Sequence, residues 1–344
     1  MRGRVRVGAD EGKFNLIIAF DLIKKLADGK FHSGQTLAEE LKINRAHIWR
    51  AITYLKSLKL EIYAVKGKGY KLASPIELLD KDKIQNKLNP KALETINLLQ
   101  ILSVTPSTND YVKEYQIRRL PEKTIVVAEA QTQGRGRLGR TWFSPFGANI
   151  YLSAYWKIHQ NLSGLSLVIG LAVAKSLEKL GMTVRVKWPN DIYVEHKKMV
   201  GILIESEFKP GLNHQNIFMG IGLNVNLQAS TYGDTEEEKA LKQSITDLTT
   251  VLGYTPSRNE LIAELLNNVV DFLELFESRG FVYFLSMWKE YDYLMGKLIS
   301  VIKPLPNQSM LGLAKGVSQR GELLLEEEGV LKAVCAGDIK VRGL

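Results

Sequence analysis

The sequence of 344 residues contains a single cysteine, Cys335, so no disulfide can form within the chain. One cysteine is typical of a reducing compartment, and we expect a cytoplasmic protein. No apolar run approaches the roughly 20 residues that a helix needs to cross a bilayer, so no membrane partner is expected. Residues 1–13 carry three arginines but lack the apolar stretch of a secretory signal. We interpret 1–13 as a basic N-terminal extension.

The composition excludes several classes of protein. Hydrophobic residues make up 45% and charged residues 24%, which is unlike disordered or collagen-like chains. The length predicts two or three domains. The net charge is +9, and residues 1–74 hold fifteen Lys/Arg against seven Asp/Glu, leaving only +1 for the remainder. This asymmetry predicts a basic N-terminal module that meets a polyanion, although a solvated basic face is the alternative.

Residues 14–75 have the pattern of a winged helix-turn-helix. Apolar residues recur at helical spacing over Phe14–Asp28, and Ser33 and Asn44 can each cap a further helix. Short alternating segments around Lys66–Gly69 predict a hairpin, the wing. Basic charge, helix spacing and wing together favour DNA binding over a plain helical packing domain. The expected DNA contacts are Ser33, Thr36, Asn44, Arg45, His47, Arg50, Lys66 and Lys68; Trp49 suits either the core or an interface.

Residues 76–291 predict a mixed α/β domain. The expected strands are Thr124–Ala130, Asn149–Trp156, Thr183–Trp188, Asp191–Val194, Met199–Glu205 and Asn216–Asn226, and the expected helices are Leu165–Leu180 and Ser257–Gly280. Residues 292–344 contain short strands separated by proline and glycine, which predicts a small β-barrel. The fold class is therefore multidomain α+β.

A loop rich in glycine and arginine spans residues 131–142, Gln-Thr-Gln-Gly-Arg-Gly-Arg-Leu-Gly-Arg-Thr-Trp. Gly134, Gly136 and Gly139 match G-x-G-x-x-G, but Pro145 prevents a following helix, which disfavours a Rossmann site and a nicotinamide oxidoreductase. The loop also lacks the G-K-[ST] ending of a Walker A motif. Three guanidinium groups on a flexible loop suit a polyphosphate or acyl phosphate. A solvated basic loop or a second nucleic-acid contact is an equal alternative for this stretch taken alone.

A second cluster lies at 187–191, Lys-Trp-Pro-Asn-Asp. Lys198 begins the next predicted strand, so hairpin geometry places it beside Asp191 and Asn190. Taken one at a time, Lys187 and Lys198 could simply be solvated, and Asp191 could simply cap a turn. Their joint occurrence favours a binding site.

Taken together, these motifs resemble the bifunctional biotin–protein ligase/biotin operon repressor family over nearly the whole chain. The resemblance is carried by the Gly-Arg-Gly-Arg-x-Gly-Arg loop followed by Trp-Phe-Ser-Pro-Phe-Gly-Ala-Asn, by Lys-Trp-Pro-Asn-Asp, and by Lys-x-x-Gly-Ile-Leu. Phe31–Gly34 and Gly67–Tyr70 are similar to that family's DNA-binding domain. The resemblance implies a DNA-binding domain at 14–75, a class II synthetase-like ligase domain at 76–291 and an SH3-like barrel at 292–344.

The resemblance also implies roles for individual residues. Biotin would be bound by Ser107, Thr108, Asn109, Gln131, Gly134, Arg135, Gly136, Arg137, Lys198 and Gly201. ATP and the adenylate would be bound by Arg140, Trp142, Lys187, Asn190, Asp191 and Asn224. Arg137, Lys187 and Lys198 would be catalytic, because they stabilise charge at the reacting phosphate. Leu138 departs from the family pattern, since a close relative has a further arginine there. The departure implies a loop with one positive charge fewer and bears on how well the loop would retain the adenylate. No metal ligands are assigned.

The implied reaction has two steps. The biotin carboxylate attacks the α-phosphorus of ATP, with Mg²⁺ neutralising the phosphates, and gives biotinyl-5′-AMP. A lysine of the biotin carboxyl carrier protein of acetyl-CoA carboxylase then attacks this anhydride. The adenylate would favour a homodimer that places two winged helices on biotin operator DNA and represses the biotin biosynthesis operon. A metabolite-sensing transcription factor without turnover and a lipoate or octanoate ligase are the competing hypotheses.

Overall fold

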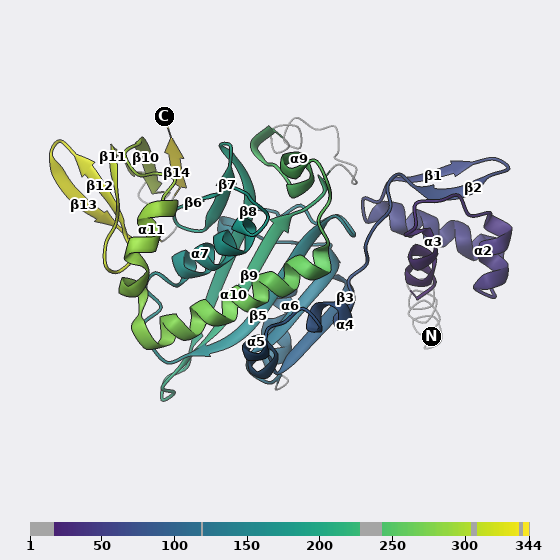
Figure 1. Cartoon of the computed structure of the whole chain (residues 1–344), viewed down its shortest axis with the longest axis horizontal. Coiled ribbons are helices and arrows are strands. Elements are labelled where there is room, and N and C mark those ends of the chain that lie inside the picture. Colours follow the sequence, from purple (N-terminus) through teal and green to yellow (C-terminus); the bar gives the residue numbers. More distant parts are fainter. Residues whose placement is uncertain (1–16, 118–119, 228–242, 304–307, 337–339, 344) are drawn as a thin grey trace, which may run out of the picture.

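The computed structural model describes residues 17–117, 120–227, 243–303, 308–336 and 340–343, and the extension predicted at 1–13 lies outside them. The described chain forms an N-terminal helical unit, a central sheet covered by helices, and a C-terminal sheet (Figure 1). Among the helices of this described part, none is long and apolar enough to cross a bilayer.

The N-terminal unit is a winged helix-turn-helix, as predicted. Residues 17–26 are helical, and α2 (Gly34–Glu40) and α3 (Arg45–Ser57) follow. The Ser33 side chain accepts a hydrogen bond from the amide of Thr36, and Asn44 caps α3 in the same way, so both predicted caps are confirmed. Strands β1 (Ile62–Val65) and β2 (Gly69–Leu72) pair antiparallel and form the wing.

The central sheet has seven strands in the order β3-β4-β5-β9-β8-β7-β6. The pair β3–β4 is parallel and every other neighbouring pair is antiparallel. The strands are β3 (Leu98–Thr105), β4 (Thr124–Gln131), β5 (Asn149–Ile158), β6 (Arg185–Lys187), β7 (Asp191–Val194), β8 (Lys197–Phe208) and β9 (Gln215–Asn224). Strand β5 is buried along nearly its whole length, which fits its apolar sequence, because helices cover both faces of the sheet.

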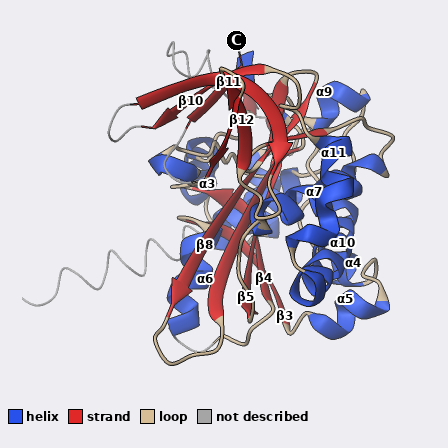
Figure 2. Cartoon of the chain, turned by 90° about the vertical axis from the view of Figure 1, so that its left-hand side faces the viewer, coloured by secondary structure: helices blue, strands red, loops and turns tan. Residues whose placement is uncertain are grey.

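Helices α7 (Leu165–Glu178) and α10 (Arg258–Arg279) lie on one face of the sheet, and α6 (Thr108–Ile117) lies on the other (Figure 2). The helix α10 is capped at its start by Ser257, whose hydroxyl accepts a hydrogen bond from the backbone amide of Glu260. The shorter helices α4 (Lys81–Gln85) and α5 (Pro90–Thr95) pack against α10. Helices α9 (Leu248–Leu252) and α11 (Leu285–Tyr291) complete this unit.

The C-terminal unit is an antiparallel sheet of five strands in the order β13-β12-β11-β10-β14. They are β10 (Leu298–Lys303), β11 (Gln308–Val317), β12 (Leu323–Glu327), β13 (Val330–Val334) and β14 (Lys340–Gly343). The predicted closed barrel is not confirmed. In the residues described at this end of the chain, no pairing joins the outer strands β13 and β14, so the sheet stays open.

A buried ion pair fixes the connector that follows the wing. Arg258 of α10 and Glu129 of β4 are 3% and 5% exposed, and their charged atoms lie 2.7 Å apart. Glu129 also accepts a hydrogen bond from the amide of Leu79, while Arg258 donates to the carbonyl oxygens of Glu77 and Asn149. The pair therefore ties the connector to two strands of the central sheet.

Replacing Arg258 by methionine should lower the free energy of unfolding by about 3–5 kcal/mol, because Glu129 would remain as an uncompensated buried carboxylate. Urea denaturation followed by circular dichroism measures this change. The matched control is Lys91→Met, which breaks a solvent-exposed pair with Asp271. That change should cost about 1 kcal/mol or less. Equal losses in the two variants would contradict the assigned role of the buried pair.

Candidate functional site

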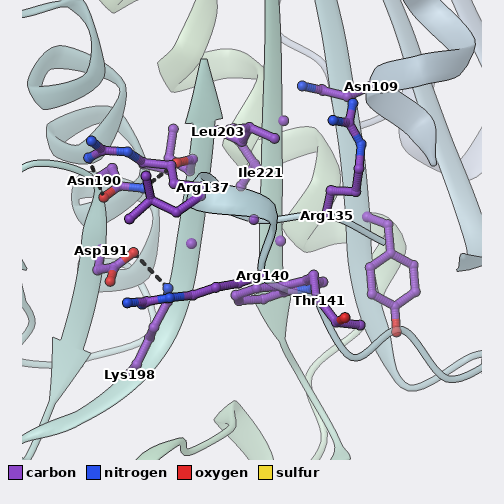
Figure 3. A pocket seen from close by; sticks show the side chains of 18 of the residues that line it. Asn109, Arg135, Arg137, Arg140, Thr141, Asn190, Asp191, Lys198, Leu203 and Ile221 are labelled. Carbon is purple, nitrogen blue, oxygen red and sulfur yellow. Dashed lines mark hydrogen bonds and ion pairs between the residues drawn. The ribbon is translucent and has the colours of Figure 1, made fainter. Parts of the chain in front are cut away.

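A cavity of about 410 Å³ lies on the central sheet beneath the glycine–arginine loop (Figure 3). Its lining includes nearly all of the residues that the sequence assigned to biotin and ATP. They are Ser107, Thr108, Asn109, Gln131, Arg135, Gly136, Arg137, Arg140, Trp142, Lys187, Asn190, Asp191, Lys198 and Gly201. Residues from distant segments of the chain thus converge on a single cavity.

The glycine–arginine loop is a closed hairpin. The amide of Trp142 donates to the carbonyl of Gly134 at 2.8 Å, and the amide of Gly136 donates to the carbonyl of Arg140 at 2.7 Å. The turn η1 (Arg137–Gly139) reverses the chain, and its central residue Leu138 has a left-handed backbone with a φ of 58°. This closure brings Arg137 and Arg140 to the same cavity.

The indole of Trp142 lies against two glycines that pair across β8 and β9, Gly201 and Gly222. A Cβ atom at Gly201 would come within 2.7 Å of the indole, and a Cβ at Gly222 would also overlap it. Any side chain at these two positions would therefore lift Trp142 off the sheet. The glycine pair provides a flat surface on which the loop rests.

The three arginines of the loop have different partners. Arg135 forms an ion pair with Asp110 and lies 3.5 Å from a carboxylate oxygen of Glu205. Arg137 donates a long hydrogen bond of 3.4 Å to the side-chain oxygen of Asn190. In Figure 3 these two arginines point to opposite ends of the cavity. The loop therefore spans the cavity with its positive charges.

Lys198 and Asp191 form an ion pair with a distance of 2.7 Å between the ammonium nitrogen and a carboxylate oxygen. The register of β7 and β8, in which Asp191 faces Gly201, places these side chains together. The ammonium of Lys198 also lies 5.3 Å from the centre of the Trp142 ring. The arrangement agrees with the hairpin geometry expected from the sequence.

Lys187 is half-buried at the same end of the cavity. Its ammonium lies 4.9 Å from the centre of the Tyr193 ring and 3.5 Å from the Tyr193 hydroxyl oxygen. Burial lowers the pKa of Lys187, and the carboxylate of Asp191 opposes that shift. Three neighbouring positive charges reinforce the lowering, those of Lys198, Lys297 and Arg140. Burial likewise raises the pKa of Tyr193 to about 12.

The other end of the cavity carries a neutral polar cluster. The side-chain oxygen of Gln131 accepts hydrogen bonds from the amide and hydroxyl of Thr108, at 2.9 and 3.1 Å. Asn109 accepts a bond from the hydroxyl of Ser153 and donates to Glu205. Thr108, Asn109 and Ser153 are buried and Gln131 is half-buried, so this cluster suits a polar ligand group that exchanges hydrogen bonds with it.

Two predicted site residues do not line the cavity. Asn224 is 3% exposed and donates to the carbonyl of Thr246. A Cβ at Gly134 would meet the hydroxyl of Ser144 at 2.5 Å, so this glycine permits close packing beneath the loop. Asn224 and Gly134 therefore contribute to the packing around the cavity and not to its lining.

The sequence prediction did not identify several residues that line the cavity. They include Tyr151, Leu152, Ser153, Tyr193, Leu203, Gly220, Ile221, Gly222 and Ile245. Two signals were available in the sequence. Ser153 is a small polar residue between the apolar neighbours Leu152 and Ala154. Gly220 and Gly222 alternate on one strand, where a glycine marks a close approach. A Cβ at Gly220 would meet the side-chain oxygen of Asn109 at 2.7 Å.

The predicted DNA contacts lie on a separate surface of the N-terminal unit. Ser33, Thr36, Asn44, Arg45, Arg50, Lys66 and Lys68 are exposed, and His47 is half-buried. Lys66 and Lys68 lie at the tip of the wing, between β1 and β2. Trp49 is 63% exposed, which excludes a core position and leaves the interface interpretation.

Gly222→Ala should displace the Trp142 indole and release the loop from the sheet. We expect faster hydrogen–deuterium exchange at the amides of Gly136 and Trp142, because their hydrogen bonds hold the loop closed. Trp142→Leu provides the control. Adding Gly222→Ala to that variant should change the loop exchange little, because the added methyl group would have no indole to meet. Slow loop exchange in Gly222→Ala would contradict the proposed contact.

Comparisons with known proteins agree with this geometry. A model of the biotin/lipoate A/B protein ligase family matches residues 101–224, and an HTH-domain model matches residues 19–71. The bifunctional ligase/repressor BirA of Salmonella typhimurium is 40% identical and covers 94% of this chain and 98% of its own length. The Escherichia coli relative of the same name is 38% identical, covering 94% and 97%.

Among solved structures, a biotin protein ligase from Aquifex aeolicus in complex with biotin and ATP superposes with a TM-score of 0.61. It is 28% identical in sequence and covers 72% of this chain and all of its own. With both family models matched and relatives aligned over almost the full length, the chain belongs to the family of bifunctional biotin–protein ligase/repressors.

Proposed function

We propose that the cavity forms biotinyl-5′-AMP from biotin and MgATP, and that the chain then transfers biotin to a lysine of biotin carboxyl carrier protein. The observation that carries this proposal is the convergence of Arg137, Lys198 and Gln131 on one cavity. The volume of about 410 Å³ lies within the range of roughly 300–1,000 Å³ found for small-molecule sites.

The two ends of the cavity suit the two halves of the product. The neutral cluster of Thr108, Asn109 and Gln131 offers amides and hydroxyls to the biotin ring. The exposed face of Trp142 offers a stacking surface to the adenine. The apolar wall formed by Leu203 and Ile221 would contact the hydrocarbon part of biotin. Biotin would thus extend from the neutral cluster towards the cations.

In the first step, an oxygen of the biotin carboxylate attacks the α-phosphorus. The bond from that phosphorus to the bridging oxygen of the β-phosphate breaks, and pyrophosphate leaves. Arg137 and Lys198 stabilise the negative charge that develops around the α-phosphorus, while Lys187 faces the leaving group. These roles are electrostatic and require no covalent intermediate with the protein.

Mg²⁺ enters this reaction as part of the substrate MgATP. In the described part of the chain, no group of three or more His, Cys, Asp or Glu side chains could hold a metal ion. Mg²⁺ at nucleotide sites keeps phosphate oxygens and waters among its ligands, so it does not require a protein cage.

In the second step, the uncharged amine of the carrier lysine attacks the carbonyl carbon of biotinyl-5′-AMP. AMP leaves, the amine loses a proton, and an amide bond forms. The hairpin closed over the cavity limits the access of water, which would otherwise hydrolyse the anhydride.

Arg137→Ala and Lys198→Met should each slow adenylate formation by roughly a hundredfold or more, because each removes a charge that faces the transition state. Single-turnover formation of biotinyl-5′-AMP measures this rate. Lys197→Met is the matched control, since Lys197 is exposed and immediately precedes Lys198. Wild-type rates in both site variants would refute these roles. ATP–pyrophosphate exchange supported by lipoate and not by biotin would favour the competing ligase.

We further propose that ligand occupancy controls DNA binding through the segment that follows Trp142. Phe146 lies in the apolar core of the N-terminal unit, where its ring stacks on Phe20 at 6.2 Å. The amide of Phe146 also donates to the carbonyl of Leu58 at the end of α3. One short segment therefore touches the cavity at one end and the DNA-binding unit at the other.

Hydrogen bonds fix the residues between these two ends. The hydroxyl of Ser144 accepts a hydrogen bond from the side-chain amide of Gln131 and donates one to the carbonyl of Trp142. The hydroxyl of Tyr151 donates to the carbonyl of Pro145 at 2.8 Å. Gln131, Trp142 and Tyr151 all line the cavity. A bound ligand would therefore contact residues that hold the segment 142–146 in place. This coupling would favour the arrangement in which a homodimer binds operator DNA.

Biotin with ATP should tighten operator binding by about 5–150-fold, the usual range of such coupling. Phe146→Leu keeps an apolar side chain in the core but loses the aromatic contact, and it should reduce this factor. Fluorescence anisotropy with labelled operator DNA measures the affinity with and without biotin and ATP. Lys66→Met serves as the control, because losing a phosphate contact should weaken binding equally with and without ligand. If the wild-type chain binds operator DNA with the same affinity in the presence and absence of biotin and ATP, the proposed coupling is contradicted.

A further inference from the structure

Two tyrosine rings stand between a cavity lysine and a lysine of the C-terminal unit. The ring centres of Tyr193 and Tyr293 lie 4.9 Å apart. The ammonium of Lys187 lies 4.9 Å from the centre of the Tyr193 ring, and that of Lys297 lies 3.4 Å from the centre of the Tyr293 ring. The four side chains thus form a continuous stack of cation, ring, ring and cation that begins at the cavity.

Backbone hydrogen bonds fix both ends of this stack. The amide of Tyr293 donates to the carbonyl of Val186, the neighbour of Lys187 on β6, at 3.0 Å. The carbonyl of Lys297 accepts from the amide of Ala314 on β11 at 2.9 Å. The connector between α11 and β10 is therefore held to the central sheet and to the C-terminal sheet at once.

Neither lysine forms an ion pair with a carboxylate within the described part of the chain. Both are half-buried, and burial lowers the pKa of each ammonium. The carboxylates of Asp191 and Asp292 oppose these two shifts without reaching ion-pair distance of Lys187 or Lys297. Two partly desolvated like charges at the ends of one stack raise the energy of the free protein. A polyanion that binds at the cavity end would relieve this repulsion.

We propose that Lys297 is a positioning residue for Lys187 in the adenylation step, through which the C-terminal sheet contributes to the nucleotide chemistry. Lys297 does not line the cavity, so it acts through the tyrosine pair and through its charge. The rings fix the place of the Lys187 ammonium. The positive charge of Lys297 stabilises the negative charge that develops on the leaving pyrophosphate.

This inference rests on the proposed ligase function and predicts an effect on one of its two steps. Pyrophosphate leaves only in adenylate formation. Transfer of biotin from preformed biotinyl-5′-AMP to the carrier protein involves no triphosphate. A general loosening of the C-terminal unit would disturb both steps, whereas the loss of a charge beside Lys187 would disturb only the first.

The test compares Lys297→Met, Lys297→Arg and the control Lys289→Met in the full chain. Lys289 is an exposed residue of α11 outside the stack. Lys297→Met should lower kcat for ATP–pyrophosphate exchange with biotin roughly three- to tenfold, as expected for one charge acting over a distance of several ångströms. Lys297→Arg should restore most of the rate, and Lys289→Met should match the wild type. Transfer from purified biotinyl-5′-AMP should be unchanged in all three variants.

The pH profile supplies a second readout. Deprotonation of Lys187 would produce an alkaline limb in the exchange rate, and Lys187→Arg identifies that limb by moving it to higher pH. Removing the positive charge of Lys297 favours the protonated form of Lys187, so its pKa should rise. The limb should then move to higher pH in Lys297→Met and stay in place in Lys297→Arg. The other titratable groups around the two lysines are unchanged in these variants. They are Asp191, Lys198, Arg140 and the Tyr193 hydroxyl around Lys187, and Asp292 beside Lys297.

The outcomes separate this inference from the proposed function. Absence of biotin-dependent exchange in the wild-type chain would overturn the ligase proposal itself. With an active wild type, unchanged exchange in Lys297→Met would overturn the positioning role. Equal losses in exchange and transfer, or no recovery with arginine, would also overturn it, because they indicate a purely structural effect.

Discussion

The cavity gathers positive charges from separate segments of the chain, and among its described lining residues Asp191 alone carries a carboxylate. Arg137 and Arg140 come from the loop, Lys187 from β6 and Lys198 from β8. Within the described lining, positively charged side chains therefore outnumber carboxylates. Burial lowers the pKa of Lys187, and the neighbouring charges of Lys198, Lys297 and Arg140 add to this lowering. The site is therefore electrostatically prepared for a polyphosphate, and the rest of the fold serves to hold these charges together.

Local rules predicted the parts of the fold in which neighbours in sequence are neighbours in space. The caps at Ser33 and Asn44 and the pairing of Lys198 with Asp191 follow from hydrogen-bond geometry over a few residues. Strand β3 was missed because its side chains are mostly half-buried and show no clear alternation. The closed C-terminal barrel was expected from short strands alone, which do not determine whether the outer strands meet.

Long-range contacts were beyond sequence reasoning for a different reason. Trp188 lies within the motif that predicted the site, yet its indole donates to the carbonyl of Gly321 in the C-terminal unit. Phe146 follows the loop, yet its ring belongs to the core of the N-terminal unit. Neither residue differs in type or spacing from an ordinary core aromatic. Only the folded chain shows that the site motifs also join the three units.

The loop itself shows how one departure from the family pattern changes the balance of charge. Leu138 occupies the turn where the family resemblance led us to expect a further arginine, and it lines the cavity without contributing a charge. Arg135 is paired with Asp110. The guanidinium groups of Arg137 and Arg140 line the cavity. Under the proposed function, the loop would be held over a bound adenylate largely by the contact between Trp142 and the glycine pair Gly201 and Gly222, a short-range interaction that salt does not screen.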